Sequence, residues 1–133
     1  MVLQPEHCNV ALAALLYMAE KYRLIVLLAD RFDDGAISDS ATNTERQARR
    51  LSATIAHEGI TAQADAECIG VALAAWADNT NRQMQKLYAQ GMVQDGALLE
   101  HNLRKVYEVI PAVESVALSL SLSAGAPAEA AEA

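Results

Sequence analysis

The residues of this sequence best suited to chemistry are two histidines, two cysteines and a glutamate. His7 and Cys8 lie near the N-terminus, Glu58 follows His57, and Cys68 comes later in the chain. Imidazole, thiolate and carboxylate groups are the ligands that zinc and related metals prefer. However, neighbours on a helix such as His7 and Cys8 point about 100° apart, and no two of the strong ligands are spaced to share one helix face. We therefore expect neither a metal nor another cofactor, and keep these residues as a candidate polar site.

Residues 57–61 read His-Glu-Gly-Ile-Thr. This run resembles the H-E-x-x-T phosphorylation box of sensor histidine kinases. The resemblance implies that His57 accepts a phosphoryl group, that Glu58 acts on the histidine and that Thr61 helps the reverse reaction. The chain has no room for an ATP-binding domain, so the resemblance implies at most a histidine phosphotransfer bundle. The same run is also typical of a helix end, which explains better why Gly59 and Thr61 occur here.

Arg50 and His57 have the R-x6-H spacing of the HEPN proteins, which are small all-helical nucleases of toxin systems. The resemblance implies an Arg and a His that converge on a phosphodiester across a dimer. Leu51 follows the Arg, where that family prefers a polar residue, and the pair lies mid-chain rather than late. A solvated Arg50 explains this pattern as well. We therefore predict no catalytic residues and a protein that is not an enzyme.

The composition indicates one helical domain. The chain has 133 residues, 53% of them hydrophobic but only 5% aromatic, and the apolar excess is Ala, Leu and Val. These residues favour helices over sheets. The net charge of −7 repels phosphate backbones, so we expect no nucleic-acid partner.

The sequence also favours a cytoplasmic protein. Two cysteines do not make a disulfide framework, and the N-terminus lacks the basic start of a signal peptide. The apolar runs 10–19 and 24–29 are divided by charged residues, and neither reaches the roughly 20 residues that a bilayer requires. We therefore expect no membrane span.

Apolar residues recur at spacings of three and four over four stretches of the chain, which predicts helices at about 5–32, 43–58, 62–90 and 96–120. Residues 33–42 have the chemistry of a loop, and Thr42 with Glu45 has the spacing of a capping box. Pro111 should kink or split the last helix. The sequence thus predicts an all-α, antiparallel (up-down) bundle of about four helices over residues 1–122, with a flexible Ala/Glu-rich tail at 123–133.

The first and last helices carry more apolar side chains than a four-helix monomer can bury. We predict that this surplus forms an interface with another chain, most simply a second copy in a homodimer. An acidic bundle of this kind is typical of regulatory or adaptor proteins of the antiactivator or chaperone type, which act on a further, unidentified protein. The predicted interface residues are Leu16, Leu24, Leu27, Leu28, Leu98, Val109 and Val116.

Overall fold

The computed structural model describes the backbone of residues 2–132 and the side chains of residues 2–123. Over this part of the chain it has four helices, no strands and a helix content of 89%. The helices are α1 (Pro5–Arg31), α2 (Gly35–Glu58), α3 (Gln63–Ala89) and α4 (Val93–Glu132). The predicted all-α bundle of about four helices is therefore confirmed.

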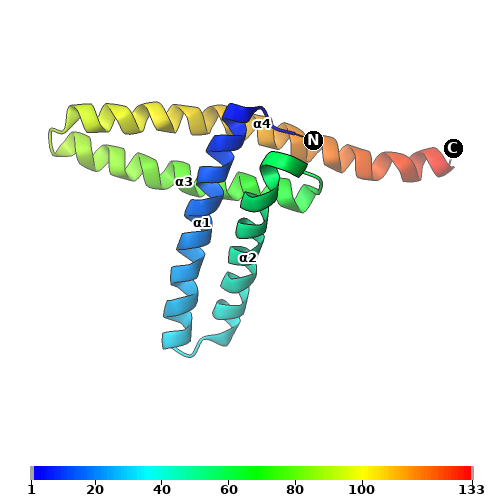
Figure 1. Cartoon of the computed structure of the whole chain (residues 1–133), viewed down its shortest axis with the longest axis horizontal. Coiled ribbons are helices and arrows are strands. Elements are labelled where there is room, and N and C mark those ends of the chain that lie inside the picture. The colour runs from blue at the N-terminus through cyan, green and yellow to red at the C-terminus, as the bar shows by residue number, and fades with distance from the viewer. Residues whose placement is uncertain (1, 133) are drawn as a thin grey trace.

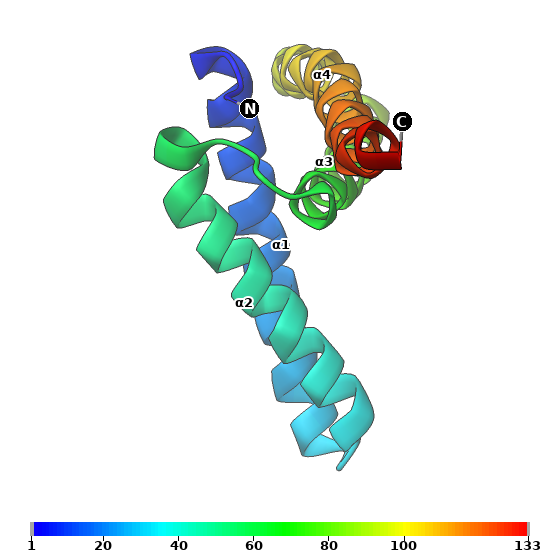
Figure 2. The same cartoon turned by 90° about the vertical axis from the view of Figure 1, so that its right-hand side faces the viewer.

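The four helices form two antiparallel hairpins that cross. Helix α1 packs against α2, and α3 packs against α4 (Figure 1). Helix α1 provides most of the contact between the hairpins, through α3 and α4. The end of the α1–α2 hairpin that carries its connecting loop projects well beyond α3 and α4 in both views (Figures 1 and 2).

The hydrophobic core lies where the hairpins cross. It takes residues from the first half of α1, the second half of α2, and the facing sides of α3 and α4. Its largest fully buried side chains are Leu15, Leu51, Ile55, Ile60, Ile69, Leu73, Val106, Val109 and Val113. Ile60 lies in the short connection between α2 and α3, so this connection is anchored in the core rather than looped into solvent.

Helix α2 begins eight residues earlier than its pattern of apolar residues predicts, because the polar segment 33–42 is largely helical. Asp34 caps the helix: its Oδ1 accepts a hydrogen bond from the backbone N–H of Ile37 at 3.2 Å. The Thr42 hydroxyl donates to the carbonyl of Ser38 within the helix, instead of capping a later start. The predicted capping box at Thr42 and Glu45 was therefore wrong, because local hydroxyl and carboxylate bonds stabilise an earlier first turn.

Helix α4 runs without interruption past Pro111. Pro111 lies on the exposed side of the helix, where water can satisfy the carbonyl of Tyr107 that loses its partner, so the predicted split does not occur. The segment Val93–Ser123 is also long and apolar enough to cross a membrane by length and composition. Five of its side chains instead pack in the core of this structure: Leu103, Val106, Val109, Val113 and Val116.

The predicted tail at 123–133 lies almost entirely beyond the last described side chain. Its flexibility stays a prediction.

Candidate functional site

The residues of the predicted polar site are spread over several surroundings. His57 and Glu58 are exposed in the last turn of α2, and Thr61 is exposed in the connection that follows. Gly59 ends the helix with a positive φ of 68°. His7 is partly buried in the first turn of α1, and Cys8 beside it lies in the core. The structure therefore presents His57 at a helix end and not along a continuous helix face.

Both cysteines are buried thiols. Burial raises the pKa of Cys68, and the nearby carboxylate of Asp65 raises it further. A raised pKa keeps the group as the unreactive thiol at neutral pH, because the thiolate is both the nucleophile and the metal ligand. Among the residues whose side chains are described, no group of three or more His, Cys, Asp or Glu residues could hold a metal ion.

Arg50 has a structural role at the hairpin crossing. Its Nη2 atom lies 2.7 Å from Oδ1 of Asp65, so the pair joins α2 to the start of α3. The Asp65 side chain is only 11% exposed, whereas that of Arg50 is 54% exposed. The guanidinium thus serves as counter-ion to a nearly buried carboxylate.

The most prominent surface feature is apolar and lies on the projecting end of the α1–α2 hairpin. We call it the tip patch. Its members are large apolar side chains with at least half of their surface exposed: Leu24, Leu27, Leu28, Phe32 and Ile37. Phe32, the C-terminal cap residue of α1, is the most exposed of them at 76%. Large apolar side chains gathered on one surface are typical of binding sites, whereas scattered ones are not.

Inside the same end of the hairpin, only small residues are buried. Between residues 20 and 47 the buried positions are Ala29, Ser38 and Ala41. The Ser38 hydroxyl donates to Oδ1 of Asp30 at 2.5 Å and so holds the two helices together. The projecting end therefore has large apolar side chains outside and small ones inside. A core that is stable without a partner has the opposite distribution, with its large apolar side chains buried.

A shallow hollow of about 220 Å³ lies at the tip. Its wall is almost entirely apolar and comes from both helices of the hairpin. Asp34, the cap of α2, is the only charged residue among the described residues that line it: Ile25, Leu28, Ala29, Phe32, Asp34 and Ile37. Three residues of the tip patch, Leu28, Phe32 and Ile37, form part of its wall.

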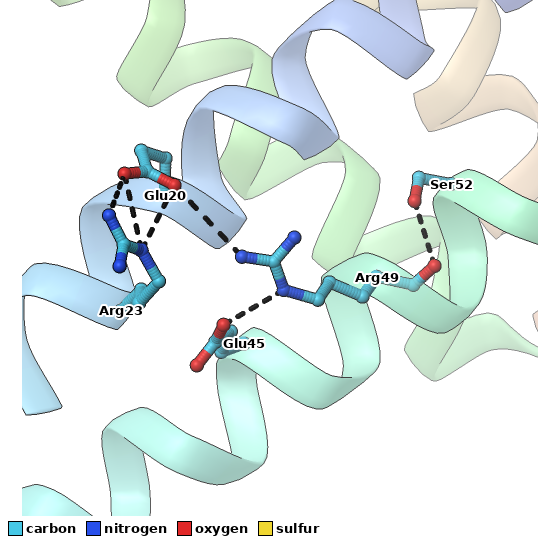
Figure 3. A network of polar contacts seen from close by, with 5 residues as sticks. All are labelled: Glu20, Arg23, Glu45, Arg49 and Ser52. Atoms are coloured by element: carbon cyan, nitrogen blue, oxygen red, sulfur yellow. Dashed lines mark hydrogen bonds and ion pairs between the residues drawn. The ribbon is translucent and has the colours of Figure 1, made fainter.

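The hairpin also has a polar side (Figure 3), where Glu20 and Arg23 lie one helical turn before Leu24 and Leu27. Arg23 forms an ion pair with Glu20 at 2.5 Å, and Arg49 of α2 does so with Glu45 at 2.8 Å. A longer contact of 4.0 Å joins Arg49 to Glu20 across the two helices. The hydrogen bond from Arg23 lowers the pKa of Glu20. These charges compensate one another, so this side is suited to remain in water.

Some of the predicted interface residues are exposed in the structure, and others are buried. Leu24, Leu27 and Leu28 lie in the tip patch, and Leu16 and Leu98 are exposed elsewhere. Val109 and Val116 are only 1% and 8% exposed, because they pack in the core of the chain itself. These two valines are therefore not part of an accessible surface in this structure.

Two tip residues were missed by sequence reasoning. Phe32 lies at the end of the predicted helix 5–32 and Ile37 in the predicted loop 33–42, and neither belongs to the predicted interface. The signal that could have found them is the short polar connection between them, which brings the end of one apolar helix next to the start of another.

Comparison of the chain with protein-family models, with curated proteins and with solved structures gives no match.

Proposed function

We propose that this protein is a non-enzymatic interaction module of regulatory or adaptor type, and that the tip patch is its binding surface. One observation carries the proposal: the projecting end of the α1–α2 hairpin exposes five large apolar side chains and buries only small ones. Exposing such side chains to water is unfavourable, by about 1.5–3 kcal/mol for each Leu or Phe relative to burial. A protein partner that covers the patch recovers this free energy.

The geometry of the hairpin supports the same function. The patch lies away from α3 and α4, so a partner can approach it without displacing the core (Figures 1 and 2). Phe32 beside an apolar hollow is a suitable anchor, because aromatic residues in desolvated pockets dominate binding energy at protein interfaces. The charged side of the hairpin, with Glu20 and Arg49, then remains in solvent.

The experiment is photo-cross-linking inside the native host. A photoreactive phenylalanine analogue replaces Phe32 of the tip patch in one version and the exposed Val71 of α3 in the control. We expect a specific protein adduct at position 32 and none at position 71. The adduct partner is then purified, and its affinity for the chain is measured by titration calorimetry.

Point variants make the titration decisive. Leu28→Asp should weaken binding at least tenfold, because a carboxylate in a desolvated interface costs well over 1.4 kcal/mol. Val71→Asp should leave the affinity unchanged. Equal affinity of the two variants would refute the tip patch as the binding surface. Loss of in vivo function in His57→Ala with binding intact would instead favour the phosphotransfer or metal alternative.

A further inference from the structure

Charged residues lie at both ends of the tip patch, and the sign of the net charge differs between the two ends. On α1, Leu24, Leu28 and Phe32 follow one another at four-residue steps and so lie along one face of the helix. Lys21 precedes Leu24 by three residues, on the same face and nearer the body of the protein. Asp33 and Asp34 follow Phe32 at the outer end, and Asp34 lines the hollow there. The apolar stripe thus has a cation at its inner end, whereas its outer end carries two carboxylates and the exposed Arg31 and is net negative.

Lys21 and Asp33 are both exposed, and neither takes part in any of the ion pairs among the described side chains. They differ in this from Glu20 and Arg23, one and two positions from Lys21, which pair with each other. The two residues are twelve positions apart in the sequence, and one helix cannot bring such distant positions together. Both charges are therefore free to pair with groups of another chain.

We infer that the tip patch binds the tip patch of a second copy of this chain, with the two α1–α2 hairpins antiparallel about a two-fold axis near Leu28. This inference rests on the proposed function and names the occupant of that same surface. In this arrangement Lys21 of each copy lies opposite Asp33 and Asp34 of the other, and the leucines meet in between. A parallel arrangement would instead place the acidic ends side by side, which is repulsive.

Packing favours the same arrangement. Four helices around a shared apolar core form the antiparallel bundle that two helices alone cannot make. In it, the half-exposed Leu24 and Leu28 of each copy are covered by those of the other. Because α3 and α4 lie at the end of the α1–α2 hairpin opposite its loop (Figure 1), this arrangement places the two α3–α4 hairpins at opposite ends of the dimer. A two-fold axis also uses the same residues twice, so each substitution acts on both halves of the interface.

The extent of the stripe sets the expected strength. From Lys21 to Phe32 the helix spans about 17 Å. A stripe of this length buries less area than an interface of the standard size, which is about 800 Å² per partner. We therefore expect a dissociation constant in the micromolar range. A dissociation constant of 1 μM corresponds to a binding free energy of about −8 kcal/mol. Sedimentation velocity of the full chain from about 1 to 300 μM covers this range.

Four variants test the inference by sedimentation, each checked for helix content by circular dichroism. Leu28→Asp should abolish the dimer over the whole range, and Val71→Asp on α3 should leave it intact. Lys21→Glu and Asp33→Lys should each weaken the dimer several-fold. The double variant Lys21→Glu/Asp33→Lys should bind more tightly than either single variant, because the swapped charges at 21 and 33 face each other again while Asp34 stays acidic.

The outcomes separate this inference from the proposed function. A wild-type chain that stays monomeric at 300 μM overturns the second copy as occupant, and cross-linking of position 32 to another protein then still supports the proposed function. A dimer that persists in Leu28→Asp overturns the tip patch as the interface. A dimer that needs Leu28 but binds no more tightly in the double variant than in either single variant overturns the antiparallel arrangement.

Discussion

Arg50 and Asp65 form an ion pair that joins the two hairpins, with 2.7 Å between Nη2 and Oδ1. Replacing Arg50 by Ala leaves a nearly buried carboxylate without its counter-ion. We expect this change to lower the free energy of unfolding by about 1 kcal/mol, because Arg50 itself is half exposed and the pair is partly screened. Arg46→Ala, at an exposed position on the same helix, is the control and should have almost no effect. Urea unfolding followed by circular dichroism measures both, and equal stabilities would show that the pair does not stabilise the crossing.

Two glycines within helices should respond to alanine in opposite directions. A Cβ atom on Gly70 of α3 would meet nothing within 4 Å, so Gly70→Ala should raise the free energy of unfolding by about 0.5–1 kcal/mol through the higher helix propensity of alanine. A Cβ atom on Gly96 of α4 would lie 2.7 Å from Cε1 of Tyr88. Gly96→Ala should therefore destabilise, because the ring must move and the hydroxyl of Tyr88 donates a hydrogen bond to Glu100 at 3.2 Å. Thermal unfolding of both variants is the measurement, and a stabilised Gly96→Ala would mean that the ring moves at no cost.

Cys68 should make stability depend on pH in the alkaline range. Burial raises the pKa of its thiol above the ordinary value of 9.0, so the folded state binds the proton more tightly than the unfolded state. The stability that follows is fully present below pH 9.0 and is lost as the pH rises through the higher pKa of the folded state. Cys68→Ala removes this contribution, so its free energy of unfolding should fall less steeply than that of the wild type above pH 9.0. Denaturant titrations at several pH values compare the slopes, and identical slopes would contradict the assignment.

The sequence predicted the regular parts of the fold well. The bounds of α1 and α3 fall within one residue of those inferred from apolar spacing, because long helices with a repeating apolar face carry a strong signal. The start of α2 was placed too late because Ser, Asp and Thr favour both loops and helix caps. Which use prevails depends on partners such as the Ile37 amide, which the sequence alone does not position.

The surface was harder to predict than the core. On α4, two different sets of apolar residues recur at helical spacing. Both sets include Leu103, Val106 and Val113. Helical spacing alone did not show that α4 would bury Val109 and Val116 while leaving Ile110 only partly covered. That choice depends on the rotation of α4 against α3 and α1, which arises from tertiary packing. By contrast, Leu24, Leu27 and Leu28 are half exposed, because α3 and α4 do not cover the projecting end of the hairpin (Figure 1). That they form an interface stays a prediction.

The division into two sequential hairpins has a consequence for how the chain folds. Within each hairpin the contacting residues are close in sequence, so the contact order is low and folding in microseconds to milliseconds is expected. The contacts of highest sequence separation are those of α1 with α3 and α4, where Leu15 is fully buried. Because these contacts close the largest loop, we expect them to form after either hairpin. In a chevron analysis, Leu15→Ala should therefore act mainly by accelerating unfolding, whereas truncations within a hairpin should slow folding.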